Sequence, residues 1–286
     1  MTCTPARSLF SHFVALAIFA CFLSCNTVFA DGIHTASDIK GALLVPLGTL
    51  PHSPENGLLD DYCTGYRAKK LSAVGRQVAK LGWIVTSEAP LGRYHVITFA
   101  SGFTPGTSAI CFARNANIGV FDGARLVALA YTSHKAGWQL GVAEPQESGT
   151  LLIWGGDGPG EPAGELRQEN DGLRLTKVAA KRTFCGGRAV VPDVYGKHID
   201  AARKVLIAHG WRPLRPHEKP VDGDAAAELA KRGVIEAETC SGTGVGYCAF
   251  EYRNTVGVLG VTTVGGDPEP GGDNFVVDYN VSCRAK

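Results

Sequence analysis

The chain has 286 residues, of which 28 are basic and 27 are acidic, and 45% of its residues are hydrophobic. This charge balance excludes a protein whose main partner is nucleic acid or an anionic membrane surface, because both are recognised by concentrated positive charge. The length is at or beyond the size at which one hydrophobic core usually divides into two domains.

Residues 1–30 have the features of a secretory signal peptide. Arg7 supplies positive charge, residues 13–23 form an unbroken apolar run, and Val28 and Ala30 offer small side chains at a cleavage site. The run is too short for a membrane span, and no later stretch approaches the roughly 20 apolar residues that a span needs. We therefore expect cleavage after Ala30 and a periplasmic or secreted mature protein without a transmembrane segment.

Cys25 allows a second interpretation of the same segment. It would become the lipid-modified first residue of a bacterial lipoprotein if the signal peptidase cut before it. The residue three before it is Phe22, where leucine is usual in such proteins, so cleavage after Ala30 is preferred. The protein is expected to be exported under either interpretation.

Six cysteines follow residue 30, and an even number in an exported chain predicts three disulfides. Cys240 and Cys248 flank a glycine-rich turn between two alternating segments, so a pair of strands would bring them face to face. The other four cysteines can then pair within each predicted domain. The favoured pairs are Cys240 with Cys248, Cys185 with Cys283, and Cys63 with Cys111.

Two segments share a helix-to-strand pattern. Residues 71–81 and residues 199–209 each place apolar side chains on one helical face, and a Gly-Trp pair follows at 82–83 and at 210–211. Asp200 is the expected N-cap of the second helix. Glycine suits the left-handed residue after a helix, and the tryptophan can fold back onto the apolar face. The repeated pattern indicates either a divergent duplication or two unrelated helix-to-strand junctions.

Alternating apolar and polar residues predict antiparallel β structure over much of the remaining chain. The clearest case is the segment 275–283, whose odd-numbered residues are expected on the dry face of a sheet. A short helix is predicted between Asp224, as its cap, and Gly233. The expected fold is α+β with two disulfide-stabilised domains, residues 31–180 and 184–286, each with one or two helices on a mostly antiparallel sheet.

Residues 190–211 carry a local resemblance to a known family. The run VPDVYG at 191–196, followed by AARKVL at 201–206 and by Gly210 and Trp211, is similar to the opening of a PASTA domain. That family recognises peptidoglycan or cell-wall precursors, so the resemblance implies binding of wall material. After Trp211 the chain departs from the family, because it carries an extra helix and additional cysteines.

Catalytic signals are few. The sequence contains neither Gly-x-Ser-x-Gly nor His-Glu-x-x-His, and we predict no metal and no cofactor. Asp157 and Glu161 lie in a glycine-rich loop without the ligand spacing of a calcium site. Cys185 is the best candidate nucleophile, since two glycines follow it and Arg188 could lower its pKa, and His198 could act as its base. This role requires a free thiol, whereas the even cysteine count favours a disulfide.

These observations predict an exported, non-catalytic binding protein. Its expected target is cell-wall glycan or peptide, or an extracytoplasmic protein that it inhibits or neutralises. Trp138 and Trp154 lie outside the Gly-Trp pairs and are the candidate binding anchors, with burial in the core as the alternative. Two other functions stay open: a cysteine-dependent cell-wall or peptide hydrolase that uses Cys185 and His198, and a structural envelope lipoprotein.

Overall fold

The computed structural model describes residues 33–108, 110–158, 160–170, 172–267, 270 and 272–285. The predicted signal peptide, its cleavage site after Ala30 and the alternative site at Cys25 lie outside these described residues. The chain from Gly32 to Lys286 forms one compact unit. The division into domains at residues 31–180 and 184–286 stays a prediction.

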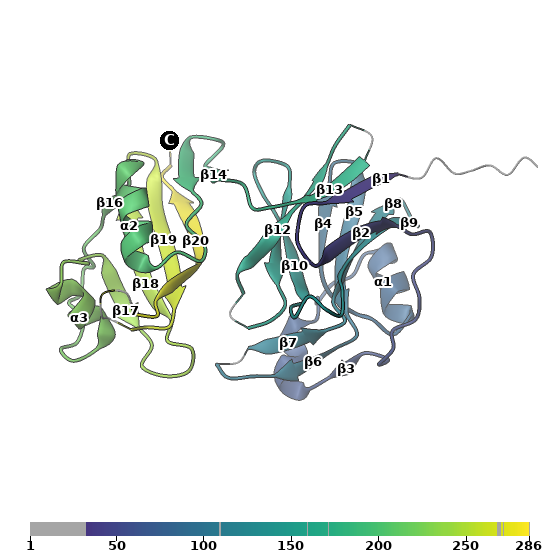
Figure 1. The fold of residues 1–286 in the computed structure, drawn as a ribbon, viewed down its shortest axis with the longest axis horizontal. Helices are drawn as coiled ribbons and strands as arrows, with labels where there is room; N and C mark the ends of the chain where they lie inside the picture. The colour runs from purple at the N-terminus through teal and green to yellow at the C-terminus, as the bar shows by residue number, and fades with distance from the viewer. Residues whose placement is uncertain are drawn as a thin grey trace, which may run out of the picture. The chain divides into compact units, whose positions relative to one another are not determined.

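Two five-stranded sheets make up most of the first half of the described chain (Figure 1). One has the order β2-β9-β8-β5-β4 and is antiparallel throughout, and the other has the order β1-β13-β12-β11-β10 with only its β1–β13 pair parallel. The strands are β1 His34–Ser37, β2 Ala42–Pro46, β4 Ile84–Leu91, β5 Tyr94–Ala100, β8 Asn117–Asp122, β9 Arg125–Thr132, β10 Leu140–Pro145, β11 Leu151–Gly155, β12 Pro162–Gln168 and β13 Gly172–Thr176.

The two sheets share one buried core. Side chains from both sheets form a single cluster of buried residues, as expected when two apolar sheet faces pack together. The sheets also meet along an edge, where the Ser87 hydroxyl of β4 donates to the Ala143 carbonyl of β10 at 3.5 Å. A smaller sheet adjoins them, and it consists of β3 Leu58–Leu59, β6 Gly102–Pro105 and β7 Cys111–Arg114, with the 3-10 helix η1 Asp61–Tyr66 beside it.

Helix α1 (Ala73–Lys80) packs against the β2-β9-β8-β5-β4 sheet through a second cluster of buried residues. Ser72 caps its start, and Gly82, at a φ of 82°, follows its end. The next residue, Trp83, is buried against the helix and the sheet, and its indole N–H donates to the Pro51 carbonyl at 2.8 Å. The predicted helix with its Gly-Trp ending is therefore confirmed here.

The second half combines two helices with antiparallel strands. Its sheet has the order β16-β18-β19-β20 with β17 also paired to β18, and β14 and β15 form a separate hairpin. A third buried cluster joins the helices to the sheet, and Asp224 caps α3 as predicted. The elements are β14 Lys181–Phe184, β15 Ala189–Pro192, α2 Ile199–Ala208, β16 Arg212–Pro213, α3 Ala225–Lys231, β17 Ala237–Cys240, β18 Cys248–Arg253, β19 Gly257–Val264 and β20 Phe275–Cys283. The expected α+β class is confirmed.

Helix α2 ends as predicted but begins differently. Its N-cap is His198, whose ring accepts a hydrogen bond from the backbone N–H of Asp200 at 3.3 Å. Asp200 lies in the first turn instead, where a carboxylate is favourable to the helix dipole. At the other end Gly210 has a φ of 84°, and the N–H of the fully buried Trp211 donates to the Leu206 carbonyl at 3.1 Å, which completes a Schellman motif.

The alternation expected along β20 holds only in part. Tyr279 is buried as predicted, but Phe275 is 37% exposed while its neighbour Val276 is buried. The pairing register between β19 and β20 shifts between Thr262 and Thr263, which leaves one extra residue on β20. An extra residue reverses which side chains point to which face of the sheet. The buried face of β20 therefore changes from even-numbered to odd-numbered residues at this point.

The six cysteines pair as the sequence predicts. The shortest loop is closed by Cys240 and Cys248, which lie directly opposite each other in the β17–β18 pair. Their Cα atoms are 4.0 Å apart, which is closer than the roughly 4.4–6.8 Å usual for a disulfide. The other two bridges, Cys63–Cys111 and Cys185–Cys283, have Cα separations of 5.8 Å and 5.6 Å.

Candidate functional site

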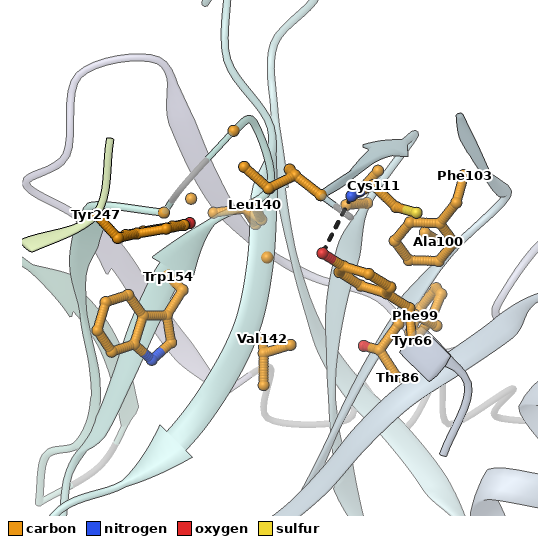
Figure 2. Close-up of a pocket in the computed structure, with 18 residues that line it drawn as sticks. Tyr66, Thr86, Phe99, Ala100, Phe103, Cys111, Leu140, Val142, Trp154 and Tyr247 are labelled. Atoms are coloured by element: carbon orange, nitrogen blue, oxygen red, sulfur yellow. Dashed lines mark hydrogen bonds between the residues drawn. The ribbon is translucent and has the colours of Figure 1, made fainter. Parts of the chain in front are cut away.

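An apolar cavity of about 360 Å³ is lined by strands of both five-stranded sheets in the first half of the chain (Figure 2). Its walls come from β4, β5, β6, β7, β10 and β11, from the end of η1, and from the loop that precedes β18. None of the described residues that line it carries a charged side chain. Its volume falls within the range of small-molecule sites, which are typically concave and mostly apolar.

Aromatic side chains and glycines form contrasting walls of this cavity. The rings of Tyr66 and Phe103 lie 5.3 Å apart on one side, and Trp154 lies on another. The glycine wall follows β11, where the backbone passes very close to β10. A Cβ at Gly156 would lie 2.4 Å from the Leu140 carbonyl oxygen, so only glycine permits this approach. The lining therefore combines bare glycine backbone with aromatic rings.

A disulfide and a hydrogen bond fix Tyr66 at the cavity. Cys63, in the same 3-10 helix, is bonded to Cys111 at the start of β7. The Tyr66 hydroxyl accepts a hydrogen bond from the backbone N–H of Cys111 at 3.1 Å. The position of this phenol is therefore set by a covalent link and by a polar contact to the same residue.

Tyr247 reaches the cavity from the hairpin loop between β17 and β18. The Cys240–Cys248 disulfide closes the base of this loop, and the Val245 N–H donates to the Ser108 hydroxyl at 3.2 Å. Burial raises the pKa of Tyr247 above its ordinary value, and the neighbouring Tyr66 phenol raises it further by a smaller amount. Its hydroxyl therefore stays protonated across the neutral range and can donate a hydrogen bond.

The two candidate tryptophan anchors lie at two neighbouring cavities. Trp154 is half-buried beside the apolar cavity, its indole N–H donates to the Glu144 carboxylate at 3.0 Å, and its ring meets Tyr195 edge-on at 5.9 Å. Trp138 is half-buried at a second cavity. Neither is a fully buried core residue, and neither is fully exposed.

The second cavity, of about 560 Å³, is more polar than the first. Its lining brings Trp138 together with Lys40, Gln139, Asp157 and Glu161. The Asp157 carboxylate accepts a hydrogen bond from the backbone N–H of Gln139, so it already has a partner. Gly155 and Gly160 line both cavities.

The structure gives Cys185 no free thiol. Its sulfur is bonded to Cys283, and a disulfide sulfur cannot act as the thiolate nucleophile that the hydrolase interpretation requires. His198, the proposed base, serves as the N-cap of α2 and lies beside the ring of Phe275. The two residues therefore have structural roles in this oxidised form.

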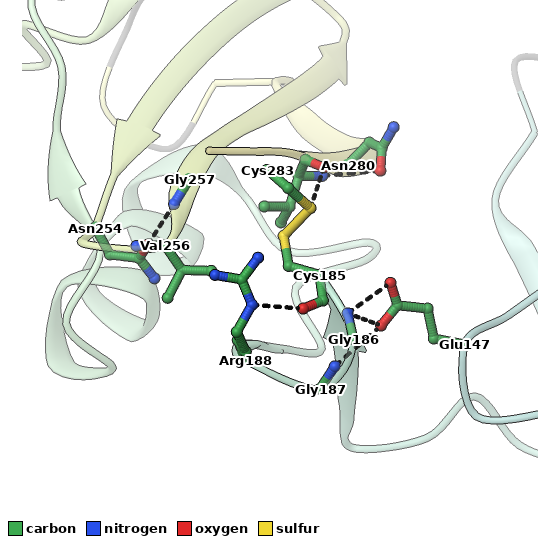
Figure 3. Close-up of a disulfide and its surroundings, with 11 residues drawn as sticks. Glu147, Cys185, Gly186, Gly187, Arg188, Asn254, Val256, Gly257, Asn280 and Cys283 are labelled. Atoms are coloured by element: carbon green, nitrogen blue, oxygen red, sulfur yellow. Dashed lines mark hydrogen bonds between the residues drawn. A yellow bond between two sulfur atoms is a disulfide. The ribbon is translucent and has the colours of Figure 1, made fainter. Parts of the chain in front are cut away.

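The two glycines after Cys185 bind a carboxylate of the chain itself (Figure 3). Gly186 and Gly187 both have positive φ, which turns their backbone N–H groups toward the same side. The Glu147 carboxylate accepts hydrogen bonds from both, at 3.0 Å and 3.3 Å. Arg188, expected to act on the thiol, instead donates to the Cys185 carbonyl at 3.0 Å. This loop is therefore occupied by an internal ligand.

The structure also brings into contact three side chains that no sequence motif predicts, those of Ser72, His95 and Glu88. The His95 Nε2 atom lies 2.6 Å from Glu88 and 3.5 Å from the Ser72 hydroxyl. A catalytic triad needs the two ring nitrogens to contact different partners, whereas one nitrogen makes both contacts here. The Ser72 hydroxyl also accepts from the Gly75 N–H at 3.0 Å as the cap of α1. The group is a helix-capping network.

Glu88 makes this network dependent on pH. Although burial acts to raise it, the pKa of Glu88 is held below its ordinary value by hydrogen bonds from Ser72 and His95. A carboxyl with a lowered folded-state pKa stabilises the fold above its unfolded pKa, and this contribution is lost as pH falls through the folded value. We expect Glu88→Gln to lower the unfolding free energy at pH 7 by about 1–2 kcal/mol.

The difference between Glu88→Gln and the native protein should begin to shrink as the pH falls below about 4.3, the ordinary glutamate pKa, and should disappear once the pH lies below the lowered pKa of native Glu88. Urea unfolding across pH 3–7 measures this dependence. The exposed Glu218 provides a matched control, and Glu218→Gln should leave the unfolding free energy unchanged at every pH. A loss that is constant from pH 3 to pH 7 would contradict the prediction.

The described residues contain neither a metal-binding cluster of side chains nor a membrane-spanning helix. Among them, no group of three or more His, Cys, Asp or Glu side chains could hold a metal ion. The helices that they form all lack the length and apolar character needed to cross a bilayer. Comparisons of the chain with protein-family models, with curated proteins and with solved structures found no match.

Proposed function

We propose that this protein is an exported, non-catalytic binding protein whose ligand site is the aromatic-lined cavity. The proposal rests on one observation: the cavity is large enough for a small ligand, and none of the described residues that line it is charged. Export is supported by the signal-peptide features of residues 1–30 and by the three disulfides, which persist in oxidising compartments.

The lining favours binding over catalysis. General acid–base catalysis needs a titratable group near neutral pH within reach of the substrate. The side-chain hydroxyls at the cavity belong to Tyr66, Thr86 and Tyr247, and Thr86 already donates to the Thr98 carbonyl at 3.1 Å. Burial of an apolar ligand, at about 25 cal/mol for each Å² of surface, is therefore the main source of affinity.

A cavity-filling substitution tests this proposal. Native protein should bind the uncharged fluorescent probe N-phenyl-1-naphthylamine at one site per chain. Val142 lines the cavity on β10, and Val142→Trp should weaken binding at least about tenfold because the new ring occupies the ligand's space. Fluorescence titration measures the dissociation constants, and circular dichroism checks the fold.

The exposed Val190, on β15, supplies the control for this experiment. Val190→Trp introduces the same side chain outside the cavity and should bind the probe like the native protein. Equal affinities of native protein and Val142→Trp, or no saturable binding by native protein, would overturn the cavity as the ligand site.

A wall glycan or peptide is the second candidate ligand, and the second cavity favours it. Sugars bind where an aromatic ring lies among charged and amide side chains, and Trp138 lies with Lys40, Asp157 and Glu161 in this way. The PASTA-like segment at 190–211 agrees with such a target. Retention of native protein by isolated peptidoglycan, lost in Trp138→Ala and kept in Val142→Trp, would favour this candidate.

The other functions expected from the sequence have more demanding requirements. A protein partner, whether inhibited or neutralised, would have to insert an apolar side chain into the same cavity. The hydrolase interpretation needs reduction of the Cys185–Cys283 bridge. The structural lipoprotein interpretation needs an acyl chain on Cys25, which a mass measurement of the exported protein would detect.

We further propose two domains, residues 31–180 and 184–286. Two of the buried clusters draw their residues from 42–175, and the third draws its residues from 184–281. A divergent duplication is supported by the shared Gly-Trp endings of α1 and α2. The sheets around these helices each have five strands but differ in strand order, since β16 and β17 both pair with β18 in the second sheet.

A further inference from the structure

Two tyrosine hydroxyls face the apolar cavity from opposite sides (Figure 2). The Tyr66 hydroxyl accepts a hydrogen bond from the Cys111 N–H, so its own proton is left to be donated. The Tyr247 hydroxyl has no hydrogen-bond partner among the described residues. Each hydroxyl therefore has an O–H group that it can donate to an acceptor atom of a ligand in the cavity.

The rest of the lining restricts what else the ligand can be. An ion would lose its hydration without gaining a counter-charge, since the described lining residues are all uncharged. The volume of about 360 Å³ lies near the lower end of the range of small-molecule sites, so the ligand must be small. Aromatic rings and bare glycine backbone supply apolar contact around such a molecule.

We propose that the cavity binds a small, uncharged, mostly apolar molecule that carries one acceptor oxygen, such as an aromatic ketone, and that Tyr66 and Tyr247 donate to this oxygen. The inference rests on the proposed function and adds the chemical class of the ligand. Tyr247 acts as a specificity-determining residue, because its hydroxyl distinguishes a carbonyl compound from a hydrocarbon of the same shape.

Three probes of similar size test the ligand class: butyrophenone, butylbenzene and 4-ethylbenzoate. Calorimetric titration of native protein should give the tightest binding for the ketone and the weakest for the carboxylate. Tyr247→Phe removes one hydroxyl and should weaken butyrophenone binding about three- to tenfold, the effect of one neutral hydrogen bond, while butylbenzene binding is unchanged. Tyr62→Phe is the matched control, since Tyr62 is 87% exposed and does not line the cavity.

The alternative outcomes distinguish a wrong ligand class from a wrong proposed function. Equal binding of ketone and hydrocarbon would exclude the acceptor requirement and would fit the apolar side chain of a protein partner. Tightest binding of 4-ethylbenzoate would show an anion site. Either result overturns the ligand class while the cavity stays a binding site, whereas no binding of these probes or of N-phenyl-1-naphthylamine overturns the proposed function. If Tyr247→Phe alters the circular dichroism, Tyr66→Phe removes the opposite donor and decides the same question.

Discussion

Replacing Arg203 by methionine is expected to lower the unfolding free energy by about 3 kcal/mol, which makes it one of the most damaging substitutions in the chain. Glu236 is fully buried, and its Oε1 atom accepts from the Arg203 guanidinium at 2.7 Å and from the Tyr252 hydroxyl at 2.8 Å. Without Arg203, the carboxylate would keep one neutral donor and lose its counter-charge. Urea unfolding measures the loss.

The double variant Arg203→Met with Glu236→Gln is the control for this prediction. Glutamine can still accept from Tyr252, and it carries no charge to be left uncompensated. The double variant should therefore recover most of the lost stability. If the double variant is as unstable as Arg203→Met alone, the loss comes from the packing of the arginine stem and not from the buried charge.

Removing the Cys185–Cys283 bridge should cost about 4 kcal/mol, because it closes the longest of the three disulfide loops, with a sequence separation of 98. The Cys240–Cys248 loop has a separation of 8, and its removal should cost about 2 kcal/mol less in the loop-entropy description. Paired alanine variants of each bridge, unfolded in urea without reductant, give the comparison. Equal losses would show that local packing outweighs loop entropy.

The same bridge decides between binding protein and cysteine hydrolase. Alkylation of the protein before reduction should label none of the six cysteines that follow residue 30. Labelling of Cys185 would show a free thiol, revive the hydrolase interpretation and direct attention to His198 as its base.

Local signals predicted the helices and the disulfide pairing well. The Gly-Trp endings depend on a few adjacent residues, since a Schellman motif needs only the last helical turn and a glycine. The Cys240–Cys248 pair could be predicted because a short turn places both cysteines at one end of a hairpin. By contrast, the register shift between β19 and β20 arises from pairing between strands, and the alternation along β20 carries no mark of it.

The apolar cavity could not be predicted in the same way. Tyr66 and Tyr247 stand far apart in sequence, and their approach depends on the fold of the whole described chain. Trp154 was identified by elimination, because it belongs to neither Gly-Trp pair, and it does line the cavity. From the sequence alone, glycines 155, 156, 158 and 160 predict a loop. In the structure they line the cavity together with β10, and this role depends on a strand contact that the sequence does not show.

The distribution of the four tryptophans provides built-in optical probes of this protein. Trp83 belongs to the core beneath α1, Trp211 to the core beneath α2, and Trp154 and Trp138 to the two cavities. Each indole therefore has different surroundings, and emission from chains that retain a single tryptophan would follow one region at a time. Unfolding of either core and occupation of either cavity can thus be observed separately without an added label.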